Sequence, residues 1–137
     1  MLMDSRFEFS TLQALTDSAA SENYIDLGVA GDADDELYLI VRVGTALVSS
    51  GKSATLVVGI QTDAASTFNT GPTTLAASGS IAEASCTANT EVFVIRLPRG
   101  IERYLRLYYT VGTEDFTSGT VDAFVTKRPQ TADFQTA

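Results

Sequence analysis

Hydrophobic and polar residues alternate along two stretches of the chain, residues 91–97 and 104–111. A period of two is that of a β-strand, in which successive side chains point to opposite faces. The turn signal Pro98-Arg99-Gly100 lies between the two stretches. We therefore predict two long strands that form the central antiparallel pair of a sheet. The apolar rows expected to face a common core are Phe93, Ile95 and Leu97, and Leu105, Leu107, Tyr109 and Val111.

The same alternation recurs on both sides of this pair. The clearest further strands are residues 37–43, 54–62 and 120–125, and the weaker ones are residues 7–9, 11–15, 23–27 and 73–80. No amphipathic helix is evident. About eight strands separated by turn signals predict an all-β fold, a jelly roll or β-sandwich of antiparallel strands. Several connections are too long for hairpins, which favours Greek-key crossing between two sheets.

Length and composition indicate one globular domain. The chain has 137 residues, of which 45% are hydrophobic and 19% charged. We expect the sandwich core at about residues 14–126. The polar ends, residues 1–13 and 127–137, are expected to form extended arms.

The charge balance excludes two classes of partner. Asp and Glu number 17 and Lys and Arg 9, so the formal net charge is −8. Such a field repels phosphate backbones and anionic lipid surfaces, and we predict neither a nucleic-acid nor a membrane partner. The first residues lack the pattern of a signal peptide, and no apolar run has the length of a membrane helix. The sequence therefore predicts a protein made in a cytoplasm.

The residue types that usually carry catalysis are scarce. Histidine is absent, and Cys86 is the only cysteine, so neither an intrachain disulfide nor a Cys–His pair can form. Cys86 is expected to pack as a small hydrophobe. We predict that the protein is not an enzyme, and the sequence indicates no catalytic residue and no cofactor.

Two short motifs have a functional and a plain interpretation. Gly51-Lys52-Ser53 resembles the end of a phosphate-binding loop, but Ala46 stands where that motif requires its first glycine. An exposed turn is therefore expected. The acidic run of residues 32–36 begins like a calcium loop but lacks the glycine and the closing glutamate. A solvated loop is expected there, and cation binding stays open.

One row of side chains is a candidate for partner binding. Tyr104, Arg106 and Tyr108 lie on one face of a predicted strand. The two rings can stack on sugars, pack at the periphery of the core, or contact a partner subunit. The absence of tryptophan favours the latter two over a sugar site.

Several segments together resemble a known family. They are Ile25-Asp26-Leu27-Gly28, Leu37-Tyr38-Leu39, Leu56 to Thr62 with Phe68 and Thr73-Thr74-Leu75-Ala76, Arg96-Leu97-Pro98 through Gly100, Glu102 to Leu107, and Tyr109 to Thr113 followed by Phe116-Thr117 and Gly119. In these segments the chain is similar to the capsid cement proteins of tailed bacteriophages, of the Bordetella-phage type. The likeness extends from about Ala14 to Val125.

The resemblance implies a jelly-roll decoration protein on the outer surface of the phage head. Its implied partners are the major capsid protein and further copies of itself, as a homodimer or homotrimer. With that function, Phe7 and Phe9 at one end and Phe134 at the other are expected to be apolar anchors set in the arms. Two alternatives stay open: a carbohydrate-binding module, and a head–tail or tail accessory protein.

Overall fold

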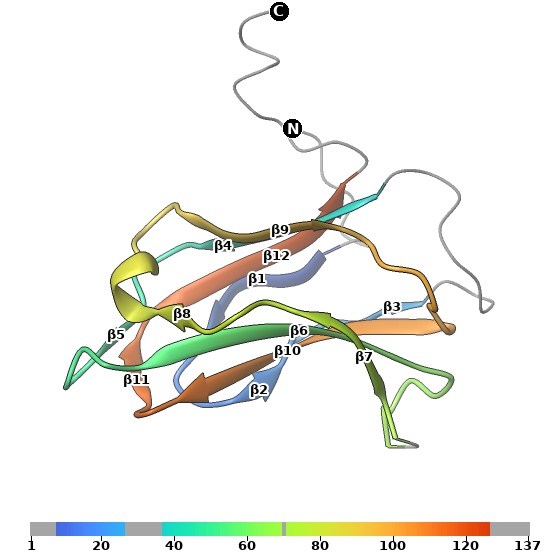
Figure 1. The fold of residues 1–137 in the computed structure, drawn as a ribbon, viewed down its shortest axis with the longest axis horizontal. Coiled ribbons are helices and arrows are strands. Elements are labelled where there is room, and N and C mark those ends of the chain that lie inside the picture. Colours follow the sequence, from blue (N-terminus) through green and yellow to red (C-terminus); the bar gives the residue numbers. More distant parts are fainter. Residues whose placement is uncertain (1–7, 27–36, 70, 127–137) are drawn as a thin grey trace, which may run out of the picture.

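The fold is a sandwich of two antiparallel β-sheets, seen in a computed structural model that describes residues 8–26, 37–69 and 71–126 (Figure 1). One sheet has the strand order β1 (Glu8–Ala14), β12 (Thr120–Thr126), β4 (Tyr38–Val43) and β9 (Glu91–Arg96). We call it sheet A. It forms the upper layer in Figure 1.

The other sheet, sheet B, is built around its two longest strands. These are β10 (Tyr104–Gly112) and β6 (Thr55–Asp63), which pair in register along their whole length. The shorter strands β2 (Ala19–Ala20) and β3 (Ile25–Asp26) pair with β10, and β7 (Thr73–Ala77) and β8 (Ile81–Ala82) pair with β6. A two-stranded ribbon of β5 (Val48–Ser49) and β11 (Phe116–Ser118) lies at one end. The described part of the chain has one helical turn, η2 (Glu83–Ser85).

The order of the strands shows how the chain winds. It passes from β1 in sheet A to β2 and β3 in sheet B, returns to β4, and continues to cross between the sheets up to β12. This confirms the predicted β-sandwich and the predicted crossing between sheets. Each sheet combines strands from both halves of the chain, the kind of arrangement that Greek-key sandwiches and jelly rolls share.

The predicted pairing of residues 91–97 with 104–111 is wrong. β9 pairs with β4 at the edge of sheet A, whereas β10 pairs with β6 in sheet B. Both apolar rows do face the common core, but from opposite sheets. The period of two specifies which face of a strand is apolar. This pattern does not distinguish two strands that are neighbours in one sheet from two strands that pack face to face in different sheets. Pro98 and Gly100 therefore belong to a connection between the layers, not to a hairpin turn.

The inward-facing rows of both sheets make one hydrophobic core. Sheet A contributes Leu39, Val41, Val43, Val121, Ala123 and Val125, and sheet B contributes Leu56, Val58, Ile60, Leu105, Leu107 and Tyr109. Cys86 belongs to the same core and is 1% exposed, which confirms that it packs as a small hydrophobe. Its burial, and secondarily the charge of Glu83, raises the pKa of the Cys86 thiol.

The amino-terminal arm is shorter than predicted. β1 begins at Glu8 and pairs with β12, so residues 8–13 are part of the sandwich. Phe9 on this strand has no exposed surface and packs in the core. The next residue, Ser10, shares a 2.8 Å hydrogen bond with the Tyr109 hydroxyl, which ties β1 to β10 across the interior. Phe9 is therefore a core residue and not an anchor on an arm.

Candidate functional site

The predicted row of Tyr104, Arg106 and Tyr108 lies on the outer face of sheet B. Each of the three side chains is half-buried, and they alternate with the core residues Leu105 and Leu107 along β10. The alternation of the strand thus separates a purely apolar inner row from an outer row of rings and charge.

Two aromatic side chains from loops extend this row. The ring of Tyr24, between β2 and β3, lies edge-on to those of Tyr104 and Phe68, with centroids 5.5 Å and 6.3 Å away. Such edge-to-face contacts are favourable because the positive edge of one ring meets the negative face of another. Tyr24 stays 49% exposed, whereas Phe68, between β6 and β7, is 6% exposed. We call these side chains, together with Arg103, Arg106 and Tyr108, the aromatic–arginine surface.

The backbone at Phe68 is in a rare conformation. Its φ is +53°, in the left-handed region that residues other than glycine seldom adopt. The cost of this conformation is about 1–3 kcal/mol for an ordinary residue. The burial of the ring beneath the guanidinium of Arg106 offsets it, since the Arg106 Cζ lies 4.5 Å from the ring centroid.

Two arginines of the surface are held in different ways. Arg103 forms a two-pronged ion pair with Asp26, with its Nε 2.8 Å from Oδ1 and its Nη2 3.1 Å from Oδ2. Arg106 donates from Nε to the amide oxygen of Gln61 at 2.7 Å, and its guanidinium also lies 5.7 Å from the Tyr108 ring. Arg103 is thus neutralised by a carboxylate and Arg106 is fixed by an uncharged group.

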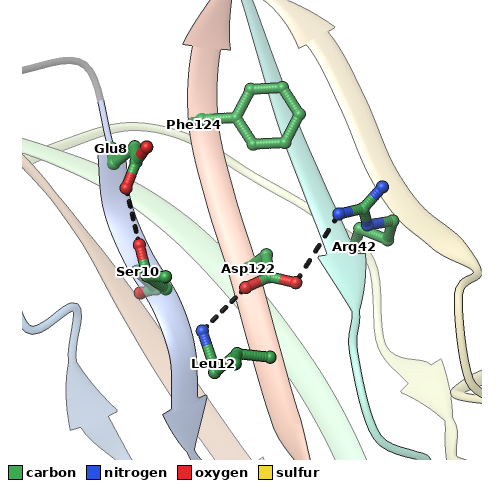
Figure 2. Close-up of a pocket in the computed structure, with 7 residues that line it drawn as sticks. Glu8, Ser10, Leu12, Arg42, Asp122 and Phe124 are labelled. Carbon is green, nitrogen blue, oxygen red and sulfur yellow. Dashed lines mark hydrogen bonds and ion pairs between the residues drawn. The ribbon is translucent and has the colours of Figure 1, made fainter. Parts of the chain in front are cut away.

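The outer face of sheet A carries a small pocket of about 150 Å³ (Figure 2). Asp122 lies at its centre: one carboxylate oxygen accepts the Leu12 N–H at 2.7 Å, and the other lies 3.7 Å from Arg42 Nη2. Leu12 has a φ of +47° and is 64% exposed, next to an irregularity in the pairing of β1 with β12. Phe124, from the same strand as Asp122, closes the pocket and is buried. Arg42 and Asp122 thus form an ion pair in this pocket, and the Glu8 carboxylate accepts the Thr11 hydroxyl at 2.6 Å.

The turn at Gly51-Lys52-Ser53 binds an anion, but one that the chain itself provides. The Glu114 carboxylate accepts the Gly51 N–H at 2.8 Å, the Ser53 N–H at 3.1 Å and the Ser53 hydroxyl. The Ser53 hydroxyl first, and then the two backbone N–H groups, lower the pKa of Glu114 to about 2. The turn is an exposed connection, as predicted, and its donors are already occupied.

Sequence reasoning identified three of the residues in the aromatic–arginine surface and missed the rest. Tyr24 and Phe68 come from loops, Arg103 directly precedes β10, and no periodicity marks any of the three. Phe7, Phe134 and the acidic run of residues 32–36 lie outside the described residues.

The described ranges hold neither a metal-ligand cluster nor a membrane-spanning helix. No three His, Cys, Asp or Glu side chains converge there as ligands. No helix in those ranges combines the length and apolar character that a bilayer span needs.

The protein thus belongs to the class of antiparallel β-sandwiches, and its candidate binding surface, the aromatic–arginine surface, lies on the outer face of sheet B. The chain belongs to the Bbp16 family, a family of Bordetella phage proteins, whose model matches residues 9–125. The match covers the whole sandwich from β1 to β12. The comparison with curated proteins finds no match.

Proposed function

We propose that this chain is a capsid cement protein that binds the outer surface of a tailed-phage head and stabilises contacts between major capsid subunits. The observation that carries the proposal is membership of a phage protein family over the complete sandwich. The aromatic–arginine surface supports it, because aromatic residues and arginine are enriched where proteins contact one another.

The side of the sandwich formed by β7 and β9 supports self-association. Phe93 and Ile95 face the core from β9, yet both are only half-buried, and Val94 on the same strand is 41% exposed. On β7, Leu75 and Ala76 are likewise half-buried. A second copy that covered this side would bury more apolar surface.

The charge pattern of this side suits contact between identical molecules. Two copies that each carry a net charge of −8 repel one another, but β7 and β8 carry no charged side chain, and the two on β9, Glu91 and Arg96, have opposite signs. We propose a homodimer or homotrimer that contacts the major capsid protein at several points at once. Multivalent contact strengthens weak individual interfaces, and this is how such an oligomer would hold a head together.

Co-sedimentation tests this function directly. Heads of the encoding phage, assembled without this protein, are mixed with the purified chain, pelleted and imaged. We expect saturable binding at regular positions on the outer surface and a higher temperature of DNA release. Heads that neither bind the protein nor gain thermal stability would exclude a cement function, and density confined to the tail or to the head–tail junction would assign an accessory protein instead.

A carbohydrate-binding module is the second candidate, and the exposed ring of Tyr24 beside Tyr104 favours it. Aromatic rings stack on the apolar faces of sugars. A glycan array and the melting temperature of the protein with added sugars distinguish the two functions. A sugar-dependent rise in melting temperature, together with no binding to heads, would favour the carbohydrate function.

A further inference from the structure

We infer that Arg106 on the outer face of sheet B is a receptor for a carboxylate, the side chain of an Asp or Glu on a neighbouring protein of the particle. The identity of that neighbour rests on the proposed cement function. The chemistry of the receptor rests on the geometry of the described residues.

The first argument is charge. Arg42 and Arg106 occupy comparable positions: each lies on the outer face of a sheet, directly across from a polar residue on the adjacent strand. Across from Arg42 is Asp122, and across from Arg106 is Gln61. In the part of the chain that the structure describes, Arg106 contacts this amide and two aromatic rings but no carboxylate. Its positive charge is held in place without being neutralised.

The second argument is rigidity. Gln61 fixes Nε of the guanidinium, and the ring of Phe68 supports its face in a backbone conformation that costs free energy. An arginine fixed in this way loses little side-chain freedom when it binds. The conformation of Phe68 thus places an aromatic support against a guanidinium that no described carboxylate neutralises.

The third argument is the chemistry of the surroundings. The hydroxyl groups of Tyr24, Tyr104 and Tyr108 form no hydrogen bond with other described residues, so each can donate one to a ligand. Two carboxylates lie nearby, and both are engaged. Asp26 is already bound to Arg103, and Asp63, two residues from Gln61 on β6 and 3% exposed, accepts the Ala65 N–H at 3.3 Å. A group of available donors with no available carboxylate fits a ligand that only accepts hydrogen bonds, and an ionised carboxylate is such a ligand. The net charge of −8 disfavours the other common acceptor, the phosphate of a nucleic acid.

The sharpest variant is Gln61→Glu. It places a carboxylate where the amide now binds Arg106, with almost no change in side-chain size. Arg106 then forms an ion pair within the protein and is no longer available to an external carboxylate. We expect its affinity for heads to fall about tenfold or more, and that of Arg106→Gln to fall by a similar factor. Gln61→Met removes the hydrogen bond that positions Arg106 without adding charge, and it is expected to lose clearly less affinity than Gln61→Glu.

Thr110→Glu is the matched control for net charge. Thr110 is exposed on the same strand and face, four residues from Arg106, which is about 13 Å along a strand. This variant is expected to bind heads as the wild type does, and all four variants should unfold cooperatively. Equal affinity of Gln61→Glu and wild type would overturn the inference while leaving the cement function intact.

A measurement without heads separates the two proposals. The Arg106 Nε–H signal of the full chain is followed by NMR during titration with N-acetylglutamate methylamide, and then with the glutamine analogue. We expect a saturable shift with the carboxylate that is absent with the amide and absent in Gln61→Glu. No shift with the carboxylate, or a shift only with a hexose, would overturn the inference even if heads are bound. A carboxylate-specific shift in a protein that fails to bind heads would retain the receptor and reject the cement function.

Discussion

The outer faces of the two sheets use arginine for different purposes. On sheet A, Arg42 pairs with Asp122, which also fixes the backbone of β1 through the Leu12 N–H. On sheet B, Arg106 is positioned by Gln61 and by aromatic rings, and no described carboxylate pairs with it. The first arrangement stabilises the chain within itself. The second leaves a guanidinium without a described counter-ion, which is the feature on which the proposed carboxylate receptor rests.

Each face also has one residue in the left-handed conformation, and these two residues should respond differently to truncation. Phe68→Ala removes a buried ring and the support of Arg106, and we expect it to lower the free energy of unfolding by about 2–4 kcal/mol. Leu12→Ala is the matched control, because Leu12 has a similar φ and is 64% exposed. It should cost about 0.5 kcal/mol or less. Urea denaturation measures both, and equal costs would mean that the Phe68 ring does not support the fold.

The two cross-strand partners of the arginines give the next largest difference. Asp122→Ala removes the acceptor of the Leu12 N–H and the counter-ion of Arg42, and should cost about 1–3 kcal/mol. Gln61→Ala removes one hydrogen bond on a surface where water can replace it, and should cost about 0.5–1 kcal/mol. Thermal unfolding monitored by circular dichroism compares them. If the Gln61 variant is the less stable one, the roles assigned to the two faces are reversed.

Relief of the backbone strain should raise the stability of the protein at Leu12 but not at Phe68. Leu12→Gly removes a left-handed penalty of about 1–2 kcal/mol and adds a chain-entropy cost of about 0.5–1 kcal/mol. The net effect should be a gain of up to about 1 kcal/mol, because little burial is lost. Phe68→Gly relieves the same strain but should still be destabilising. Calorimetric melting temperatures of the two variants give the comparison, and a clear loss of stability in Leu12→Gly would show that its exposed side chain contributes to the fold.

The smallest effect concerns an exposed carboxylate away from both faces. Because the folded-state pKa of Glu114 is about 2, below its ordinary value of 4.5, its contacts stabilise the folded state above about pH 4.5. That contribution is lost progressively as the pH falls from about 4.5 to 2. The melting temperature of Glu114→Gln should therefore lie slightly below that of the wild type at pH 6, and the two should converge near pH 2. A constant difference across that range would mean that the carboxylate titrates normally.

The sequence allowed most of the strands and their inner faces to be predicted, but not the sheet to which each strand belongs. Leu39, Val41, Leu105 and Leu107 face the core as their alternation requires. The assignment of β9 and β10 to one sheet failed because a period of two carries no information about which strand lies alongside.

The surface residues divide in the same way. Tyr104, Arg106 and Tyr108 could be identified because a strand places them two residues apart on one face. Tyr24 and Phe68 reach the same surface from loops, where no periodicity marks them. Phe68 does so in a left-handed backbone conformation that an aromatic residue seldom adopts. The prediction for Phe9 was wrong because an isolated phenylalanine near the start of the chain fits both an anchor on an arm and a core residue.

In sheet A, β12 lies between β1 and β4, although it follows both in the chain by about eighty residues or more. Until β12 has been synthesised, β1 lacks the strand with which it pairs, and the core around Phe9 is incomplete. Closure of the sandwich must therefore wait until β12 has been made, and long-range pairing of this kind slows folding. A copy truncated before β12 would lack the strand that joins β1 to β4, and its interior would stay open to water.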